Sequence, residues 1–207
     1  MMTRRFLQLL IGLAMYGVSL AMFIRAGLGL DPWDVFHQGI AVKTGLSIGT
    51  VVVIVSFLVL LLWIPLRQWP GVGTLCNAVL VGVFADIGLA LIPAFSHLGG
   101  QAGMLAGAIL LNGIASACYI GARLGPGARD GLMTGLARRT GWSVRASRTG
   151  IEVVVLGAGW LLGGSVGVGT VLYAVAIGPL VQLLLPRFTV PEPKVPTPLA
   201  PGVAVAP

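Results

Sequence analysis

Six apolar runs, each about as long as a membrane-spanning helix, place the strongest constraint on the fold of this chain. A spanning helix needs about 20 predominantly apolar residues. The sequence is 57% hydrophobic and only 9% charged, whereas a soluble domain has about 25% charged residues. The pattern predicts an all-α polytopic membrane protein with six transmembrane helices, over about residues 6–25, 46–66, 72–93, 102–121, 149–165 and 167–186.

The basic residues divide unevenly between the two sides of this layout. With the N-terminus in the cytoplasm, 11 of the 13 Lys and Arg residues lie inside, and only Arg25 and Lys43 lie outside. Cytoplasmic segments of membrane proteins carry an excess of Lys and Arg. The division predicts cytoplasmic N- and C-termini. It also explains the net charge of +7 through topology, so we expect no nucleic acid as a partner.

The chain contains an internal repeat with a spacing of 96 residues. Residues 26–50 align without a gap on residues 122–146, and nine of these 25 positions are identical. The same shift places the GVGT at 71–74 on the GVGT at 167–170. Each copy contains three predicted spans, and an odd number means that the second copy enters the membrane from the opposite side. Inverted repeats of this kind are typical of secondary transporters.

The repeat divides the chain into a first three-span repeat, residues 1–96, and a second, residues 97–187. Residues 188–207 form a Pro-rich cytoplasmic tail that we expect to be disordered. Each repeat also contains a polar segment, 31–44 or 127–140, that is too short and too charged to span the membrane. We expect each segment to form a short helix that is either interfacial or re-entrant.

The first polar segment carries a helix-start signal. In the stretch LDPWDVFHQG, Asp31 is a good N-cap, Pro32 suits the first helical position, and Asp34 falls in the first turn. Asp34 recurs as Asp130 in the second copy. Two interpretations of this pair stay open. Each carboxylate stabilises a helix N-terminus, or the two bind a cation or carry a proton, one at each membrane face.

Polar residues within the predicted spans are candidates for a substrate or ion site, because a charge at membrane depth is costly. Asp86 lies inside the third span, and its counterpart in the repeat is Gln182. A functional role and a buried hydrogen-bond network are both open for Asp86. Glu152 follows Arg148 by one helical turn, so an interfacial i,i+4 ion pair is the alternative to a functional role for this residue.

Arg129 and four glycines complete the set of candidate residues. Arg129 adjoins Asp130, and it either pairs with that carboxylate or holds an anionic lipid headgroup. Small residues let transmembrane helices approach closely. We therefore expect packing roles for the glycines that the repeat pairs, which are Gly29 with Gly125 and Gly73 with Gly169.

No motif in the sequence points to an enzyme. The chain has no HExxH or Walker motif. We therefore predict no catalytic residue, no metal site and no cofactor. The partners that we expect are the lipid bilayer and an unknown small solute or ion. A second copy of the chain is a further expected partner, since six helices are few for a complete carrier.

Several stretches together are similar to one bacterial family: GLDPWDVFHQG, TGLSIGT, GARDGLM and TGWSVRASRTGIEVVVLGAGWLLGGSVGVGTVLYAVAIGPL. The chain resembles the YczE-like (YczE/YyaS/YitT) family of bacterial integral membrane proteins over about residues 5–188. The resemblance implies a multi-pass protein of the bacterial plasma (inner) membrane. It supplies no catalytic residues.

The architecture favours a small secondary transporter or permease-like protein with a site at the repeat interface. Architecture alone does not fix function. The alternative is a non-transporting membrane accessory protein that supports the assembly or stability of another complex. A transporter requires polar residues that converge on an interior cavity, whereas an accessory protein needs a closed interior and a lipid-facing groove.

Overall fold

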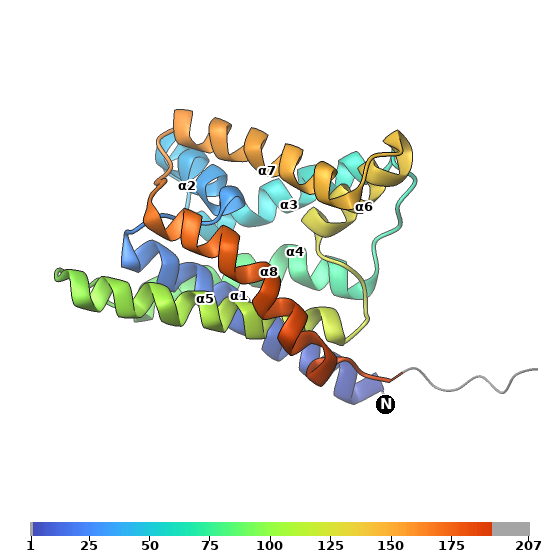
Figure 1. Ribbon diagram of the computed structural model, residues 1–207, viewed down its shortest axis with the longest axis horizontal. Coiled ribbons are helices and arrows are strands. Elements are labelled where there is room, and N and C mark those ends of the chain that lie inside the picture. The colour runs from blue at the N-terminus through green and yellow to red at the C-terminus, as the bar shows by residue number, and fades with distance from the viewer. Residues whose placement is uncertain (1, 192–207) are drawn as a thin grey trace, which may run out of the picture.

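The structure, a computed structural model, describes residues 2–191, and these residues form α-helices and loops without a strand (Figure 1). The tail predicted for residues 188–207 lies outside the described residues from residue 192 onward. The helices in the described part are α1 (Met2–Ala26), α2 (Pro32–Thr44), α3 (Ile48–Trp63), α4 (Val72–Leu91), α5 (Leu98–Gly121), α6 (Ala128–Thr140), α7 (Val144–Leu161) and α8 (Val168–Phe188).

Four helices, α1, α4, α5 and α8, are long and apolar enough to cross a membrane. A fifth crossing results if α2 and α3 form one span, broken by a bend of 115°. α3 has 16 residues, so it is about 24 Å long, against about 30 Å of membrane hydrocarbon. α7 carries three charged side chains, those of Arg145, Arg148 and Glu152. The structure thus supports an all-α membrane protein with four or five such helices, and the sixth span stays a prediction.

The helices of the two halves correspond at the spacing of 96 residues found in the sequence. α2 and α6 each have 13 residues and begin at the equivalent positions Pro32 and Ala128. Both are followed by a glycine in the left-handed conformation, Gly45 with a φ of 73° and Gly141 with a φ of 76°. The same shift relates the starts of the other three helix pairs. The repeated sequence therefore encodes a repeated order of helices.

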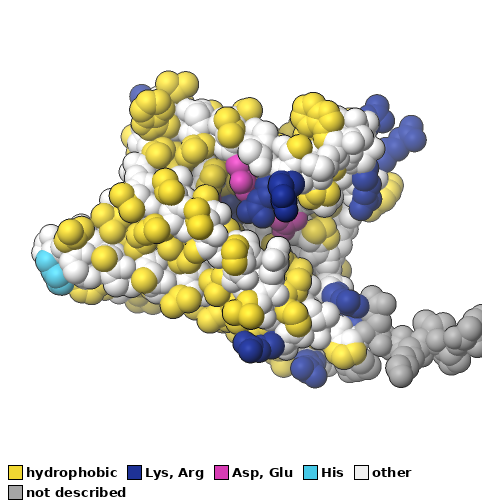
Figure 2. Space-filling view, viewed as in Figure 1, with side chains coloured by type: hydrophobic (Ala, Val, Ile, Leu, Met, Phe, Trp, Pro, Cys, Tyr) yellow, Lys and Arg dark blue, Asp and Glu magenta, His cyan; other side chains and the backbone are white. Residues whose placement is uncertain are grey.

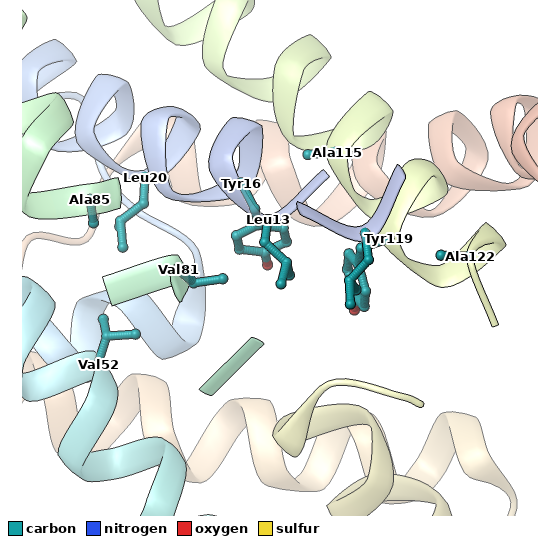
Figure 3. Close-up of a cluster of buried hydrophobic side chains, with 10 residues drawn as sticks. Leu13, Tyr16, Leu20, Val52, Val81, Ala85, Ala115, Tyr119 and Ala122 are labelled. Atoms are coloured by element: carbon teal, nitrogen blue, oxygen red, sulfur yellow. The ribbon is translucent and has the colours of Figure 1, made fainter. Parts of the chain in front are cut away.

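α1 packs against α4 and α5. Figure 3 shows one buried cluster at these contacts, which includes Leu13, Tyr16 and Leu20 of α1, Ala85 of α4 and Ala115 of α5. A Cβ atom on Gly17 would lie 2.6 Å from the carbonyl oxygen of Val81, so α1 and α4 approach backbone to backbone. Close packing of this kind is what associates helices in a membrane, where lipid tails are as apolar as leucine.

The two halves interlock where the loop before α2 meets the first turn of α8, and where the loop before α6 meets the first turn of α4. The amide of Gly169 donates a hydrogen bond to the carbonyl oxygen of Leu28 at 2.8 Å. The amide of Gly73 donates an equivalent bond to the carbonyl oxygen of Leu124, also at 2.8 Å. Each half thus accepts a hydrogen bond from an amide in the first turn of a helix of the other half. Such an amide has no acceptor within its own helix.

Gly29 and Gly125 follow these two carbonyl groups and have backbone conformations that favour glycine, with φ angles of 111° and 130°. A Cβ atom on Gly29 would lie 2.6 Å from the amide nitrogen of Gly167. One on Gly125 would lie 2.7 Å from Oγ1 of Thr74. Both positions therefore require glycine for two reasons, the backbone conformation and the close contact.

Gly29→Ala is expected to destabilise the protein by at least about 2 kcal/mol, because the added methyl group clashes at a position whose backbone conformation already disfavours alanine. Gly45→Ala is the matched control. Its φ is also positive, at 73°, but nothing lies within 4 Å of a Cβ atom there, so its cost should be about 1 kcal/mol. Thermal unfolding in detergent micelles measures both values. An equal loss in the two variants would contradict a stabilising role for the interlock.

Candidate functional site

A cavity of about 260 Å³ lies inside the bundle and is lined by residues of all eight described helices. Equivalent positions of the two halves line it together. Trp33 and Arg129 are 96 residues apart, and so are Asn77 and Tyr173. The cavity therefore lies at the interface between the two repeats.

α2 and α6 begin at this cavity and run outward from it. Asp31, which precedes α2 and lines the cavity, is 2% exposed, whereas the helix ends at the exposed Thr44. α6 likewise begins at the buried Ala128 and ends at the exposed Thr140. The N-termini of the two helices, which are the positive ends of the helix dipoles, therefore meet inside the bundle. Both helices therefore enter the protein, and neither lies flat on its surface.

Two carboxylates lie at the start of α2. Oδ1 of Asp31, the N-cap residue, accepts a hydrogen bond from the backbone N–H of Asp34 at 2.7 Å, and Pro32 occupies the first helical position. Oδ1 of Asp34 lies 3.1 Å from Nδ1 of His37, and both side chains are buried. Asp31 thus caps the start of α2, and the carboxylate of Asp34 contacts the buried imidazole of His37.

Arg129, the second residue of α6, lies where the two N-termini meet. Its Nη1 is 3.6 Å from Oδ2 of Asp31, and its Nη2 donates to the hydroxyl of Tyr16 at 3.1 Å. Its guanidinium carbon lies 5.8 Å from the ring centre of Tyr16 and 5.6 Å from that of Trp33, which are cation–π distances. The sequence suggested Asp130 or a lipid headgroup as the partner of Arg129. The structure instead pairs it with Asp31, across the two halves.

Asp130 lies in the first turn of α6 and accepts a hydrogen bond from the hydroxyl of Tyr119 at 2.7 Å. The ring of Tyr119 packs edge-on against that of Tyr16, with 6.1 Å between the ring centres. Asp34 and Asp130 thus hold equivalent helical positions but have different partners, a histidine and a tyrosine. The repeat thus places a carboxylate at the same position of both helices, and the neighbouring side chains determine its hydrogen-bond partner.

α7 and α8 contribute charged and polar groups to a different side of the cavity. Nε of Arg148 donates to Oε1 of Glu152 at 2.8 Å, and both residues line the cavity from α7. Gly178 and Gln182 line it from α8. Figure 2 shows acidic and basic side chains gathered in a hollow between these two helices. The i,i+4 pair expected from the sequence is therefore present, and it also places two charges on the cavity wall.

Asp86 connects α4 to the start of α3. Its Oδ2 accepts a hydrogen bond from the hydroxyl of Ser47 at 2.6 Å, and its Oδ1 accepts one from the backbone N–H of Gly49 at 2.8 Å. Gly49 and Gly82 bring the two helix backbones into contact at the same level. The sequence placed Asp86 next to the site. Asp86 does not line the cavity, and both its carboxylate oxygens are used in the α3–α4 contact, which fits the hydrogen-bond network that was the alternative to a functional role.

The equivalent contact in the second half is open. Gly178 is the counterpart of Gly82, yet a Cβ atom on Gly178 would meet nothing within 4 Å. α3 packs against α4, whereas its counterpart α7 packs against α2 and α6. The cavity therefore opens between α7 and α8, while the matching contact between α3 and α4 is closed.

Several polar residues in or beside the cavity were missed in the sequence. Nδ2 of Asn112 donates to Oγ of Ser19 at 2.9 Å, and its Oδ1 accepts the hydroxyl of Tyr173 at 3.3 Å. Single polar or aromatic residues inside apolar runs resemble packing residues, so no local signal identifies them. His37 could have been found, because it follows Asp34 by three residues and so lies on the same helix face. The other missed residues that line the cavity are Tyr16, Trp33, Ser56, Asn77, Ser116 and Tyr119.

The described residues offer no cluster for a metal ion. Within residues 2–191, no group of three or more His, Cys, Asp or Glu side chains is placed to hold one. Cys76 and Cys118 are free thiols. The cavity provides ion pairs, hydrogen bonds and aromatic faces.

Known proteins match this chain over most of its length. A family of unknown function, DUF6198, matches residues 3–186. An uncharacterized protein of Haemophilus influenzae is 38% identical over 177 residues, which cover 86% of this chain and 81% of that protein. The uncharacterized membrane protein YczE of Bacillus subtilis is 37% identical over 173 residues, 83% of this chain and 80% of that protein.

A more distant relative is the uncharacterized protein YyaS of Bacillus subtilis, which is 26% identical over 184 residues, 85% of this chain and 90% of that protein. No solved structure matches the chain. The family match and the two closer relatives each cover more than three quarters of the sequence. The chain therefore belongs to the YczE-like family of membrane proteins, which is the DUF6198 family.

Proposed function

We propose that the protein is a small secondary transporter of the bacterial plasma (inner) membrane that moves a small polar solute or ion through the central cavity. The observation that carries this proposal is the unequal closure of two equivalent contacts. α3 is closed on α4 through Asp86, while the cavity opens between α7 and α8. A carrier that exposes its site to one side at a time has this form in each of its end states.

The proposal includes six spans in two inverted three-helix repeats, each with one half-membrane helix. In Figure 1, α1 and α5 lie side by side with opposite chain directions, as such an arrangement requires. The excess of Lys and Arg on one side supports cytoplasmic N- and C-termini. The opening between α7 and α8 then faces the cytoplasm, because the lining residues Arg148 and Glu152 are close to the α6–α7 turn with Arg138 and Arg139.

The cavity offers a solute both signs of charge within a confined volume. The pairs Arg129–Asp31 and Arg148–Glu152 place two positive and two negative groups on the cavity wall. A charged solute can replace one partner of a pair. Since Arg129 and Asp31 belong to different halves, such a replacement changes the contact between the halves. This exchange connects solute binding to helix movement.

A second candidate function is a non-transporting accessory protein that supports another membrane complex. An apolar groove of about 840 Å³ between α2, α3, α6 and α7 favours it, because a groove of this kind fits a lipid chain or a helix of a partner. The groove does not account for the charges around the cavity. A purely structural protein loses little when buried ion pairs are replaced by well-packed apolar residues, so the transporter is the better supported of the two.

Cysteine accessibility tests whether water reaches the cavity from one side. In a variant without Cys76 and Cys118, Val181→Cys is expected to react with a membrane-impermeant maleimide added from the cytoplasmic side, because Val181 lines the cavity. Ala85→Cys is the matched control at the equivalent position of the first half. Ala85 is 0% exposed, so it should stay unlabelled. Equal labelling of the two positions, or none at position 181, would argue against a cavity open on this side.

Transport itself is tested in proteoliposomes with a panel of inorganic ions and small metabolites. Gly178→Leu is expected to reduce the flux strongly, because its side chain enters the cavity, and open space around its Cβ atom spares the helix packing. Gly103→Leu on α5 also has open space around its Cβ atom and should leave the flux unchanged. We would abandon transport if the wild-type protein moved none of the panel and position 181 stayed unlabelled.

Asp86→Ala is expected to loosen the α3–α4 contact by about 1–3 kcal/mol, because two hydrogen-bond donors lose their acceptor. The protein should then spend more time open to the outer side, so labelling of Ala85→Cys, the equivalent of position 181 in the first half, should rise from that side. Gln182→Ala is the control, because the Gln182 side chain has no hydrogen bond within residues 2–191. Outer-side labelling that does not change in the Asp86 variant would contradict a closing role for this carboxylate.

A further inference from the structure

The apolar groove between α2, α3, α6 and α7 is separate in chemistry from the cavity. It has a volume of about 840 Å³, and its lining is apolar except for Ser147. Equivalent positions of the two halves line it together, as Phe36 and Leu132 do. The groove therefore follows the same interface between the repeats as the cavity does.

The groove is open at the surface of the bundle. Several of its lining side chains are more than half exposed, including Leu58 at 55%, Leu61 at 58% and Val154 at 69%. A contiguous apolar surface of this kind marks an interaction site for a partner or a lipid. Its occupant must be apolar along most of its length, because the groove offers almost no hydrogen-bonding groups.

One end of the groove is strongly basic. Arg138 and Arg139 in the last turn of α6 and Arg145 in the first turn of α7 are exposed, and Trp142 between them lines the groove and is 59% exposed. None of the three arginines has an acidic partner within residues 2–191. Figure 2 shows basic side chains at the end of the molecule where Figure 1 places α6.

The other end of the groove lacks this charge. The α2–α3 turn carries Lys43 alone, and the positions equivalent to Arg138, Trp142 and Arg145 are Val42, Leu46 and Gly49. A ligand that fits the whole surface therefore has one anionic end and one apolar end.

We propose that the groove binds an anionic phospholipid, with an acyl chain between α3 and α7 and the phosphate group on Arg138, Arg139 and Arg145. Clusters of Lys and Arg next to membrane helices bind anionic lipid headgroups. Trp142 lies at the boundary, where tryptophan prefers to be. A second copy of the chain fits less well, because two copies with the same orientation would bring six arginines together on one membrane face.

The test is a titration of the delipidated, full-length protein with phosphatidylglycerol or phosphatidylcholine, followed by native mass spectrometry. Phosphatidylglycerol is expected to bind at least about tenfold more tightly, because a cluster of arginines attracts an anionic headgroup. Replacement of all three arginines by glutamine should remove this preference. Phosphatidylglycerol with brominated acyl chains should quench tryptophan fluorescence, and the quenching should fall but not vanish in Trp142→Phe, because Trp33 also lines the groove.

Gly150→Leu tests the groove itself. Gly150 lines it and has nothing within 4 Å of a Cβ atom, so a leucine there fills the groove without a clash. Gly157→Leu on the same helix has equal space and lies outside the groove lining. Phosphatidylglycerol binding should fall in the first variant only. Equal binding of the two lipids, or unchanged binding in Gly150→Leu, would overturn the proposal. So would a wild-type dimer that Gly150→Leu dissociates, since a second copy would then be the occupant.

Discussion

The ion pair between the partly buried Arg129 and the buried Asp31 is the interaction on which the interior of this protein depends. A guanidinium inside a membrane bundle is tolerated only where other groups compensate its charge. Here the compensation comes from a carboxylate at the start of α2 and from the rings of Tyr16 and Trp33. Because Asp31 belongs to the first half and Arg129 to the second, the pair forms only when both short helices enter with their N-termini inward. The ion pair thereby fixes the position of each short helix relative to the other.

The features that the sequence predicts well are local ones. The cap at Asp31 and the pair of Arg148 with Glu152 depend on residues three or four positions apart, and both are present. The repeat at 96 residues relates the starts of four helix pairs. Partners that lie far apart along the chain left no signal: Asp86 binds Ser47, 39 residues earlier. The apolar run 46–66 also exceeds α3, because the helix ends at Trp63 and a turn follows.

The repeat gives two copies of one contact, and a few substitutions make them unequal. Gly49 lets α3 lie directly against α4, and even a Cβ atom at this position would overlap the α4 backbone. Its counterpart on α7 is Arg145. α7 therefore cannot approach α8 as closely as α3 approaches α4. In the carrier proposed above, the two end states would therefore differ in free energy, and these residues favour the state that opens between α7 and α8.

In the proposed carrier, the difference between the α3–α4 and α7–α8 contacts determines what the solute must do. The α3–α4 contact has its own closing group, a carboxylate that accepts two hydrogen bonds. The neutral Gln182 stands in the equivalent place on α8 and makes no such bond within residues 2–191. A ligand shifts an equilibrium only by its difference in affinity for the two states. Closure of α7 on α8 must therefore draw its free energy from a solute that contacts both helices, and Arg148, Glu152 and Gln182 are the groups that line the cavity where such a solute would bind.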